Sequence, residues 1–334
     1  MGHRLLLLWR RRAEPAKIRG VERSATAPPA EGFDSITLTS ADGSTTAEFV
    51  PEANMVCCSL VVDGNELLDR RRGVRAYAEQ GKTMGVPLLY PWANRLARFG
   101  YEAAGRTVTL SEDDSRIPRD GNGLPIHGVL PGLLRWDVED SGAPGTTAAR
   151  LRWHDDVLLE LFPFPHEVRC EASVGRGELT LTTTLTASGD GPVPVSFGYH
   201  PYTRVPGAGR DDWLVTLGAA DRLVLDDHSI PTGERVPVDF EPFGLGGVSL
   251  DDGYEATPPP AAFHAATGGG TKLTVEFLCG YPYAQAFAPP GQEFICFEPM
   301  TAPTNALNSG TGLTVVAPGE SYRAQFRIGL SRGT

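Results

Sequence analysis

Four short segments of the chain each place a polar side chain among apolar or rigid neighbours. They cover residues 85–96, 124–128, 196–202 and 294–306. Surroundings of this kind fix a rotamer and shift a pKa. Glu298 is the clearest case, because it follows an apolar run and precedes Pro299, which is expected to end the strand ladder. We expect this carboxylate to be partly desolvated, with its pKa raised toward the range of a general base.

Each of the other polar side chains also has an ordinary interpretation. His127 and His200 could be hydrogen-bonded core histidines, and Arg95 could pair with a carboxylate at the surface. Trp92 and Trp136 would then belong to the core. It is the occurrence of all four segments in one chain that favours a common site.

Several well-known catalytic motifs are missing. The sequence contains no GxSxG nucleophile elbow, no GxxxxGK[ST] phosphate loop, no GxGxxG after a strand and no HExxH. Hydrolases of the elbow type, nucleotide-dependent enzymes and zinc proteases are therefore disfavoured.

The elements that must position these residues are predicted to be strands. Alternating or β-branched runs recur at 35–39, 106–110, 178–186, 213–217, 272–277 and 322–328. The 39 glycines and 28 prolines suit a chain that reverses direction often, and no long helical period is present. We predict a single all-β domain, a large antiparallel β-sandwich over residues 33–331, preceded by a disordered extension at 1–32.

Composition restricts the partners. The net charge of −11 argues against binding to nucleic acid or to an anionic membrane surface. The five cysteines have no zinc-site spacing, so we expect them to be reduced and mostly structural. The apolar run near the N-terminus is shorter than a signal-peptide core, and no run is long enough for a membrane span. A cytoplasmic protein, monomeric or homodimeric, is expected.

The four segments, in this order, resemble the aldose 1-epimerase (galactose mutarotase) family. The matching patterns are P-x-x-x-P-W-x-N-R ending at Arg95, H-G at His127 with a following Trp, H-P-Y at His200, and E-P-x-T-x-x-x-N-A starting at Glu298. The resemblance runs from about residue 34 to residue 330 and implies the galactose mutarotase-like supersandwich.

The resemblance also implies roles. Glu298 corresponds to the base that takes the anomeric hydroxyl proton, and His200 to the acid that protonates the ring oxygen. The implied sugar-binding residues are Asn94, Arg95, His127 and an aspartate, for which Asp251 is chosen over Asp252 because Tyr254 follows it by three positions.

The implied reaction interconverts the α and β anomers of an aldohexose by acid and base catalysis, without a cofactor or a metal. Acid and base are expected on opposite sides of the anomeric centre. One alternative is a hexose-6-phosphate 1-epimerase, which would need a phosphate cluster from arginines such as Arg70, Arg71, Arg72, Arg75 and Arg98. Alternatives of other classes are a glycoside hydrolase or lyase, which needs two carboxylates, and a non-catalytic sugar-binding protein.

Overall fold

The computed structural model describes residues 31–140 and 142–333. The extension expected over residues 1–32 lies outside them, except for its last two residues. Strands dominate the described chain, and every pair of strands in it is antiparallel. This confirms the predicted all-β, sandwich-type fold. Each of the six predicted runs falls in a strand, and the longest helix has eight residues.

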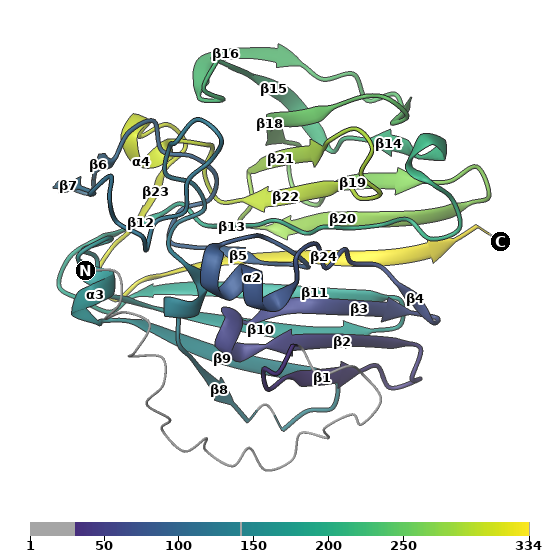
Figure 1. Cartoon of the computed structure of the whole chain (residues 1–334), viewed down its shortest axis with the longest axis horizontal. Helices are drawn as coiled ribbons and strands as arrows, with labels where there is room; N and C mark the ends of the chain where they lie inside the picture. Colours follow the sequence, from purple (N-terminus) through teal and green to yellow (C-terminus); the bar gives the residue numbers. More distant parts are fainter. Residues whose placement is uncertain (1–30, 141, 334) are drawn as a thin grey trace.

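A nine-stranded sheet forms one layer of the molecule. In Figure 1 its strand β24 crosses the middle, between β11 and β20. Apolar and polar residues alternate along its central strands, so one face is buried and the other meets solvent. In spatial order the strands are β17 (Phe243–Gly244), β14 (Leu214–Thr216), β19 (Ala261–Ala266), β20 (Thr271–Cys279), β24 (Ser321–Arg332), β11 (Glu178–Ala187), β10 (His166–Gly175), β9 (Thr146–Trp153) and β8 (Trp136–Glu139).

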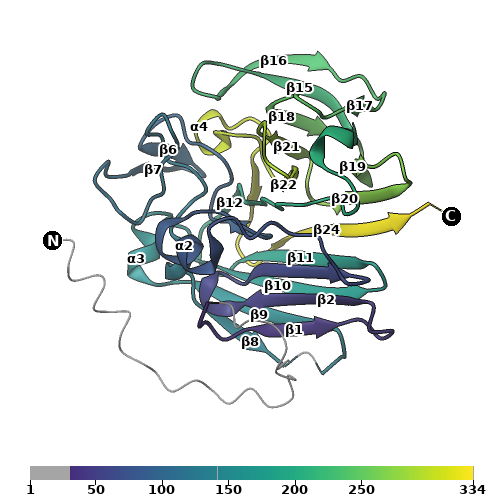
Figure 2. The same cartoon turned by 45° about the vertical axis from the view of Figure 1, so that its right-hand side comes forward.

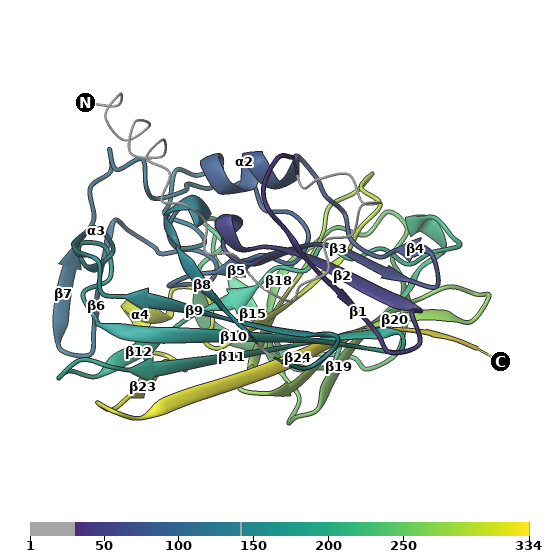
Figure 3. The same cartoon turned by 90° about the horizontal axis from the view of Figure 1, so that it is seen from below.

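Two smaller sheets cover the buried face. The view from below in Figure 3 shows the four-stranded sheet lying over β8–β11. Its strands are β1 (Ile36–Thr39), β2 (Thr45–Val50), β3 (Val56–Val62) and β4 (Asn65–Glu66). The seven-stranded sheet consists of β16 (Pro231–Pro237), β15 (Ala219–Leu225), β18 (Leu250–Ala256), β21 (Tyr283–Ala288), β22 (Cys296–Met300), β13 (Gly198–Tyr199) and β5 (Leu88–Leu89).

The remaining elements are short. Figure 2 shows β6 and β7 beside α4 at one end of the molecule. Two-stranded pairs form from β6 (Gly100–Ala103) with β7 (Arg106–Thr109), and from β12 (Val193–Val195) with β23 (Thr314–Val316). The helices are α2 (Gly73–Gln80), α3 (Asp156–Leu159), α4 (Ala306–Ser309) and the 3₁₀ turns η1 (Pro51–Ala53), η2 (Pro131–Leu133) and η3 (Arg210–Asp212). None of the helices in the described ranges is long and apolar enough to cross a membrane.

The main core lies between the nine-stranded sheet and the two smaller sheets that cover it. Phe297 of β22 meets Phe263 of β19 across this layer, with ring centroids 5.6 Å apart. Because neighbouring side chains in a strand point to opposite faces, Glu298 points away from the nine-stranded sheet. It lies on the face that the loops around residues 90–96 and 120–128 approach.

Pro299 does not end the ladder, so that expectation was wrong. It lies inside β22, and the residue after it, Met300, still pairs with Tyr283 and Gly198. β21 pairs with the residues on both sides of the proline, and β13 adds a pairing at Met300. Glu298 is therefore in the middle of a strand, which is a more rigid position than a strand end.

Candidate active site

Three adjacent strands bring Glu298 together with two polar side chains on one face. Gln285 of β21 is the direct cross-strand partner of Glu298. Gly253 of β18 is the partner of Gln285, and Asp251 lies two residues before it, on the same face. The Gln285 Nε2 atom donates to Asp251 Oδ1 at 2.7 Å. The register of the sheet therefore places Glu298, Gln285 and Asp251 in one polar row, which no local sequence pattern predicts.

His200 reaches this row because β13 packs tightly against β22. A Cβ atom on Gly198 would lie 2.7 Å from the Pro299 carbonyl oxygen, so a glycine is required for this approach. His200 follows β13 directly, and its Nε2 atom lies 3.1 Å from Glu298 Oε1. Its ring stacks on Tyr202, with centroids 4.4 Å apart and an angle of 5° between the planes. The two residues predicted to act on protons are therefore in direct contact, rather than on opposite sides of a substrate-sized space.

Burial dominates the electrostatics of this pair. Glu298 is 1% exposed and His200 is 5% exposed. Burial raises the pKa of Glu298 well above its usual value; Asp251 adds to this rise and Arg95 opposes it. Burial also lowers the pKa of His200 well below its usual value, and the neighbouring His127 lowers it further. Both shifts disfavour the charged form, so the environment favours a pair that holds one proton between the two groups.

Each member of the pair keeps one polar atom free. Glu298 Oε2 and His200 Nδ1 are buried and have no hydrogen-bond partner within residues 31–140 and 142–333. A buried polar atom without a partner costs free energy and is uncommon in folded proteins. Such atoms are typical of sites that complete their hydrogen bonds with a ligand.

His127 is held by the loop that carries Asn94. Both residues have positive φ angles, 61° and 57°. The His127 N–H donates to the Asn94 carbonyl at 2.9 Å, and the Asn94 N–H donates to His127 Nδ1 at 3.3 Å. Burial, with Arg95 next in effect, lowers the pKa of His127 to about 3. The ring is therefore neutral, with its proton on Nε2, and acts as a hydrogen-bond donor there.

Arg95 connects the buried pair to the rim of the site. Its Nε atom donates to Asp120 Oδ2 at 2.7 Å, and its NH1 donates to Asn94 Oδ1 at 3.1 Å. Its NH2 lies 3.8 Å from Asp251 Oδ2. Asp252 instead pairs with Arg222 at 3.2 Å, so the structure brings Asp251, and not Asp252, to the other candidate residues.

All six residues singled out from the sequence meet in one place, and two further residues join them. The sequence-based residues are Glu298, His200, His127, Asn94, Arg95 and Asp251. Gln285 and Asp120 are the additional ones. Gln285 lies in the alternating run 283–288 and Asp120 in a turn-like DGNG sequence, so neither carried a local signal.

Of the arginines considered for a phosphate cluster, Arg71 lies beside the site, 5.6 Å from the centroid of the Tyr202 ring, whereas Arg70 and Arg75 pair with glutamates elsewhere. Arg70 lies 3.8 Å from Glu48, and Arg75 lies 3.2 Å from Glu79. Arg71 donates to the side-chain oxygen of Gln292 at 2.8 Å. Within the described residues, no three His, Cys, Asp or Glu side chains gather so that they could hold a metal ion. All five cysteines are free thiols.

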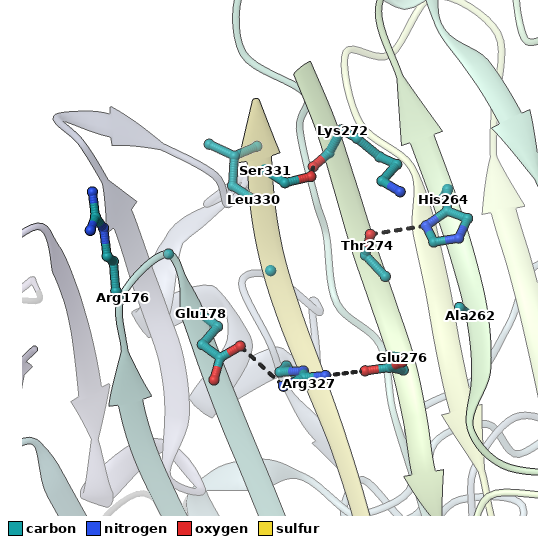
Figure 4. A pocket seen from close by; sticks show the side chains of 12 residues that line it. Arg176, Glu178, Ala262, His264, Lys272, Thr274, Glu276, Arg327, Leu330 and Ser331 are labelled. Carbon is teal, nitrogen blue, oxygen red and sulfur yellow. Dashed lines mark hydrogen bonds and ion pairs between the residues drawn. The ribbon is translucent and has the colours of Figure 1, made fainter. Parts of the chain in front are cut away.

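A separate hollow of about 360 Å³ opens on the outer face of the nine-stranded sheet, over β11, β24, β20 and β19. Figure 4 shows Arg327 between Glu178 and Glu276, and His264 bonded to Thr274. Of the two arginines that line it, Arg327 is already paired with two carboxylates. The hollow lies on the opposite side of the nine-stranded sheet from Glu298, and we do not assign the site to it.

The comparisons with known proteins agree with this geometry. The sequence profile of the aldose 1-epimerase family matches residues 57–329, so the chain belongs to that family. A curated relative, the uncharacterized protein YihR of Escherichia coli K12, is 23% identical over 253 residues, which cover 72% of this chain and 77% of the relative.

Solved structures show the same fold. A galactose mutarotase-like protein from Clostridium acetobutylicum superposes with a TM-score of 0.79 at 16% identity, covering 91% of this chain and 96% of that one. A galactose 1-epimerase from Lactobacillus acidophilus has a TM-score of 0.70 at 14% identity, with 90% and 95% covered. At these identities the likeness concerns the fold alone.

Proposed function

We propose that this protein is an aldose 1-epimerase that interconverts the α and β anomers of an aldohexose. The observation that carries the proposal is the contact of 3.1 Å between His200 Nε2 and Glu298 Oε1, both buried on the sheet face that also carries Asp251. Family membership supports the reaction class, and the identity of the sugar is part of the proposal.

The chemistry fits a base and an acid that are side by side. The anomeric hydroxyl oxygen and the ring oxygen are bonded to the same carbon, so the groups that serve them must be neighbours. With the single proton of the pair on His200, the ionised Glu298 takes the hydroxyl proton, the bond between the anomeric carbon and the ring oxygen breaks, and that oxygen receives the proton from His200. The free aldehyde rotates about its bond to the next carbon. The ring then closes on the opposite face with the proton transfers reversed.

The rim residues are proposed to bind the sugar hydroxyls. Arg95 and Asp251 offer charged hydrogen bonds, which are stronger and shorter than neutral ones. Neutral His127 offers an N–H group, and Gln285 lies between Asp251 and Glu298. A glycoside hydrolase would instead use two carboxylates, for which Glu298 and Asp251 are the candidates, but the group in direct contact with Glu298 is a histidine.

The test is polarimetry of freshly dissolved α-D-glucose and α-D-galactose, above the spontaneous rate. Glu298→Gln and His200→Gln should each lower kcat by about 10²- to 10⁴-fold, because each removes a positioned proton-transfer group. Glu48→Gln and His264→Gln are matched controls. Glu48 is a buried carboxylate beside Arg70 and His264 lies on the outer sheet face, so both variants should keep wild-type rates.

The outcomes separate the alternatives. Wild-type turnover in both site variants would refute the assigned roles. Acceleration only with glucose 6-phosphate would favour the phosphorylated substrate. No acceleration with any sugar, together with saturable sugar binding, would favour a binding protein, and cleavage of aryl glycosides would favour a hydrolase.

A further inference from the structure

The loop before His127 contains a carboxylate whose two oxygens have separate tasks. Asp120 Oδ1 accepts the backbone N–H groups of Asn122 and Leu124, both at 2.9 Å. Its Oδ2 accepts the Arg95 Nε–H at 2.7 Å. The Asp120 side chain is 4% exposed, so this pair differs from a solvated surface ion pair. One carboxylate thus closes its own turn and holds an arginine from another loop.

The two loops also meet through their backbones. The Leu96 N–H donates to the Pro125 carbonyl, and the His127 N–H donates to the Asn94 carbonyl, both at 2.9 Å. Arg95 also forms a β-bridge with Ile126. These bonds join the segment that carries Arg95 to the segment that carries His127. The Asp120–Arg95 ion pair adds a side-chain contact to these backbone bonds, and we call the whole connection the joint between the two loops.

This joint determines which edge of Arg95 remains available. Asp120 occupies Nε, and Asn94 Oδ1 accepts from NH1. The NH2 atom lies toward Asp251, at 3.8 Å. A guanidinium presents its donors in a fixed planar fork, so fixing one edge also fixes the direction of the other.

We infer that Asp120 is a positioning residue of the sugar site, which holds the free edge of Arg95 toward Asp251 and the sugar hydroxyls. The inference rests on the proposed function, because it assigns that edge to the substrate. Asp120 acts through Arg95 and does not touch the reacting atoms.

The charge of Asp120 also reaches the base indirectly. Arg95 lowers the pKa of Glu298, whereas Asp251 raises it. Asp120 partly neutralises Arg95. Without the Asp120 charge, the field of Arg95 at Glu298 is less compensated, and the pKa of Glu298 falls. The charged or titratable groups near Glu298 are His200, Tyr202, Cys296, Asp251 and Arg95.

The experiment compares Asp120→Asn with Asp114→Asn. Asp114 is a good control, because it also pairs with an arginine, Arg116 at 2.6 Å, and its side chain is 12% exposed. Rates of mutarotation are measured against sugar concentration and pH. Asp120→Asn should raise KM by about 10- to 100-fold, the range for one charge-assisted hydrogen bond. It should also move the acid limb of kcat/KM to lower pH, whereas Asp114→Asn changes neither.

Asp120→Glu tests the charge separately from the geometry. It keeps the carboxylate but adds a methylene, so KM should rise while the acid limb stays at the wild-type pH. Should Asp120→Asn fail to fold, this variant carries the test, and a wild-type KM for it would overturn the inference. An unchanged KM and acid limb in folded Asp120→Asn would overturn it too, as would an equal effect of Asp114→Asn.

A readout without turnover keeps this inference distinct from the proposed reaction. The Arg95 Nε–H donates to a buried carboxylate, so its NMR signal should exchange slowly with water in the wild type. Arg95→Lys identifies the signal. Asp120→Asn should remove the protection, and Asp114→Asn should leave it intact. A wild type without mutarotase activity would refute the proposed function, while a fast-exchanging Arg95 signal in the wild type would refute the joint itself.

Discussion

Gly128 offers a quantitative test of how the site is built. It follows His127, has a φ angle of 77°, and forms a bridge with Tyr90. A Cβ atom at this position would lie 1.9 Å from the Tyr90 carbonyl oxygen and 2.7 Å from the Pro91 nitrogen. Gly128→Ala therefore combines the cost of a left-handed conformation, about 1–2 kcal/mol, with an overpacking cost of about 1–3 kcal/mol. We expect a loss of about 2–5 kcal/mol in the free energy of unfolding.

Gly105→Ala separates the conformational cost from the overpacking cost. Gly105 has a φ angle of 76°, but a Cβ atom there meets nothing within 4 Å. Its variant should lose only the conformational term, about 1–2 kcal/mol. Urea unfolding of both variants, with the slope checked for two-state behaviour, measures the difference. The KM for sugar should rise in Gly128→Ala alone, because His127 is its neighbour. A loss in Gly128→Ala no larger than that in Gly105→Ala would refute the close-approach argument.

Two further predictions concern charge and pH. Asp251→Asn should raise KM by about tenfold or more, because Asp251 lies at the Arg95 edge and accepts from Gln285. Asp252→Asn should leave the kinetics unchanged, since Asp252 pairs with Arg222, and equal effects of the two variants would contradict the choice of Asp251. Burial lowers the pKa of His166 to about 3. Below pH 6.5 this histidine therefore binds a proton in the unfolded chain but stays neutral in the folded protein. Stability should therefore fall as the pH drops below 6.5, by about 1.4 kcal/mol per pH unit for this histidine. The urea midpoint of His166→Gln, measured from pH 7 to pH 4, should fall less steeply than that of the wild type, and parallel slopes would contradict the assignment.

The fold class was accessible from sequence because strand periodicity is local. The run 178–186 alternates polar and apolar residues, and it forms β11 in the centre of the nine-stranded sheet. The order of the strands was not accessible. β13 pairs with both β5 and β22, which are about a hundred residues away on either side. Pairings at that separation depend on packing of the complete chain, and no short pattern specifies them.

The same limit explains which site residues were found. Glu298, His200 and Arg95 lie in unusual local segments, which mix prolines, aromatic residues and one charge. Gln285 lies between two alanines in an ordinary strand, and only the sheet register sets it opposite Glu298. Asp120 lies in an ordinary turn sequence, and only the approach of a second loop gives its free oxygen a partner. Residues that act through tertiary contacts leave little trace in their own neighbourhood.

The distribution of charge in the site suits the neutral sugar that we propose as its substrate. At the centre, burial disfavours charge on both Glu298 and His200, and transfer of the single proton of the pair from one group to the other leaves the net charge of the site unchanged. At the rim, the side chain of Arg95 is 14% exposed and that of Asp251 is 43% exposed, and the two form an ion pair at 3.8 Å. Charged groups at the rim can bind hydroxyls strongly without fixing where the proton lies. The proposed reversible ring opening needs this separation, because in it Glu298 and His200 exchange roles when the ring closes.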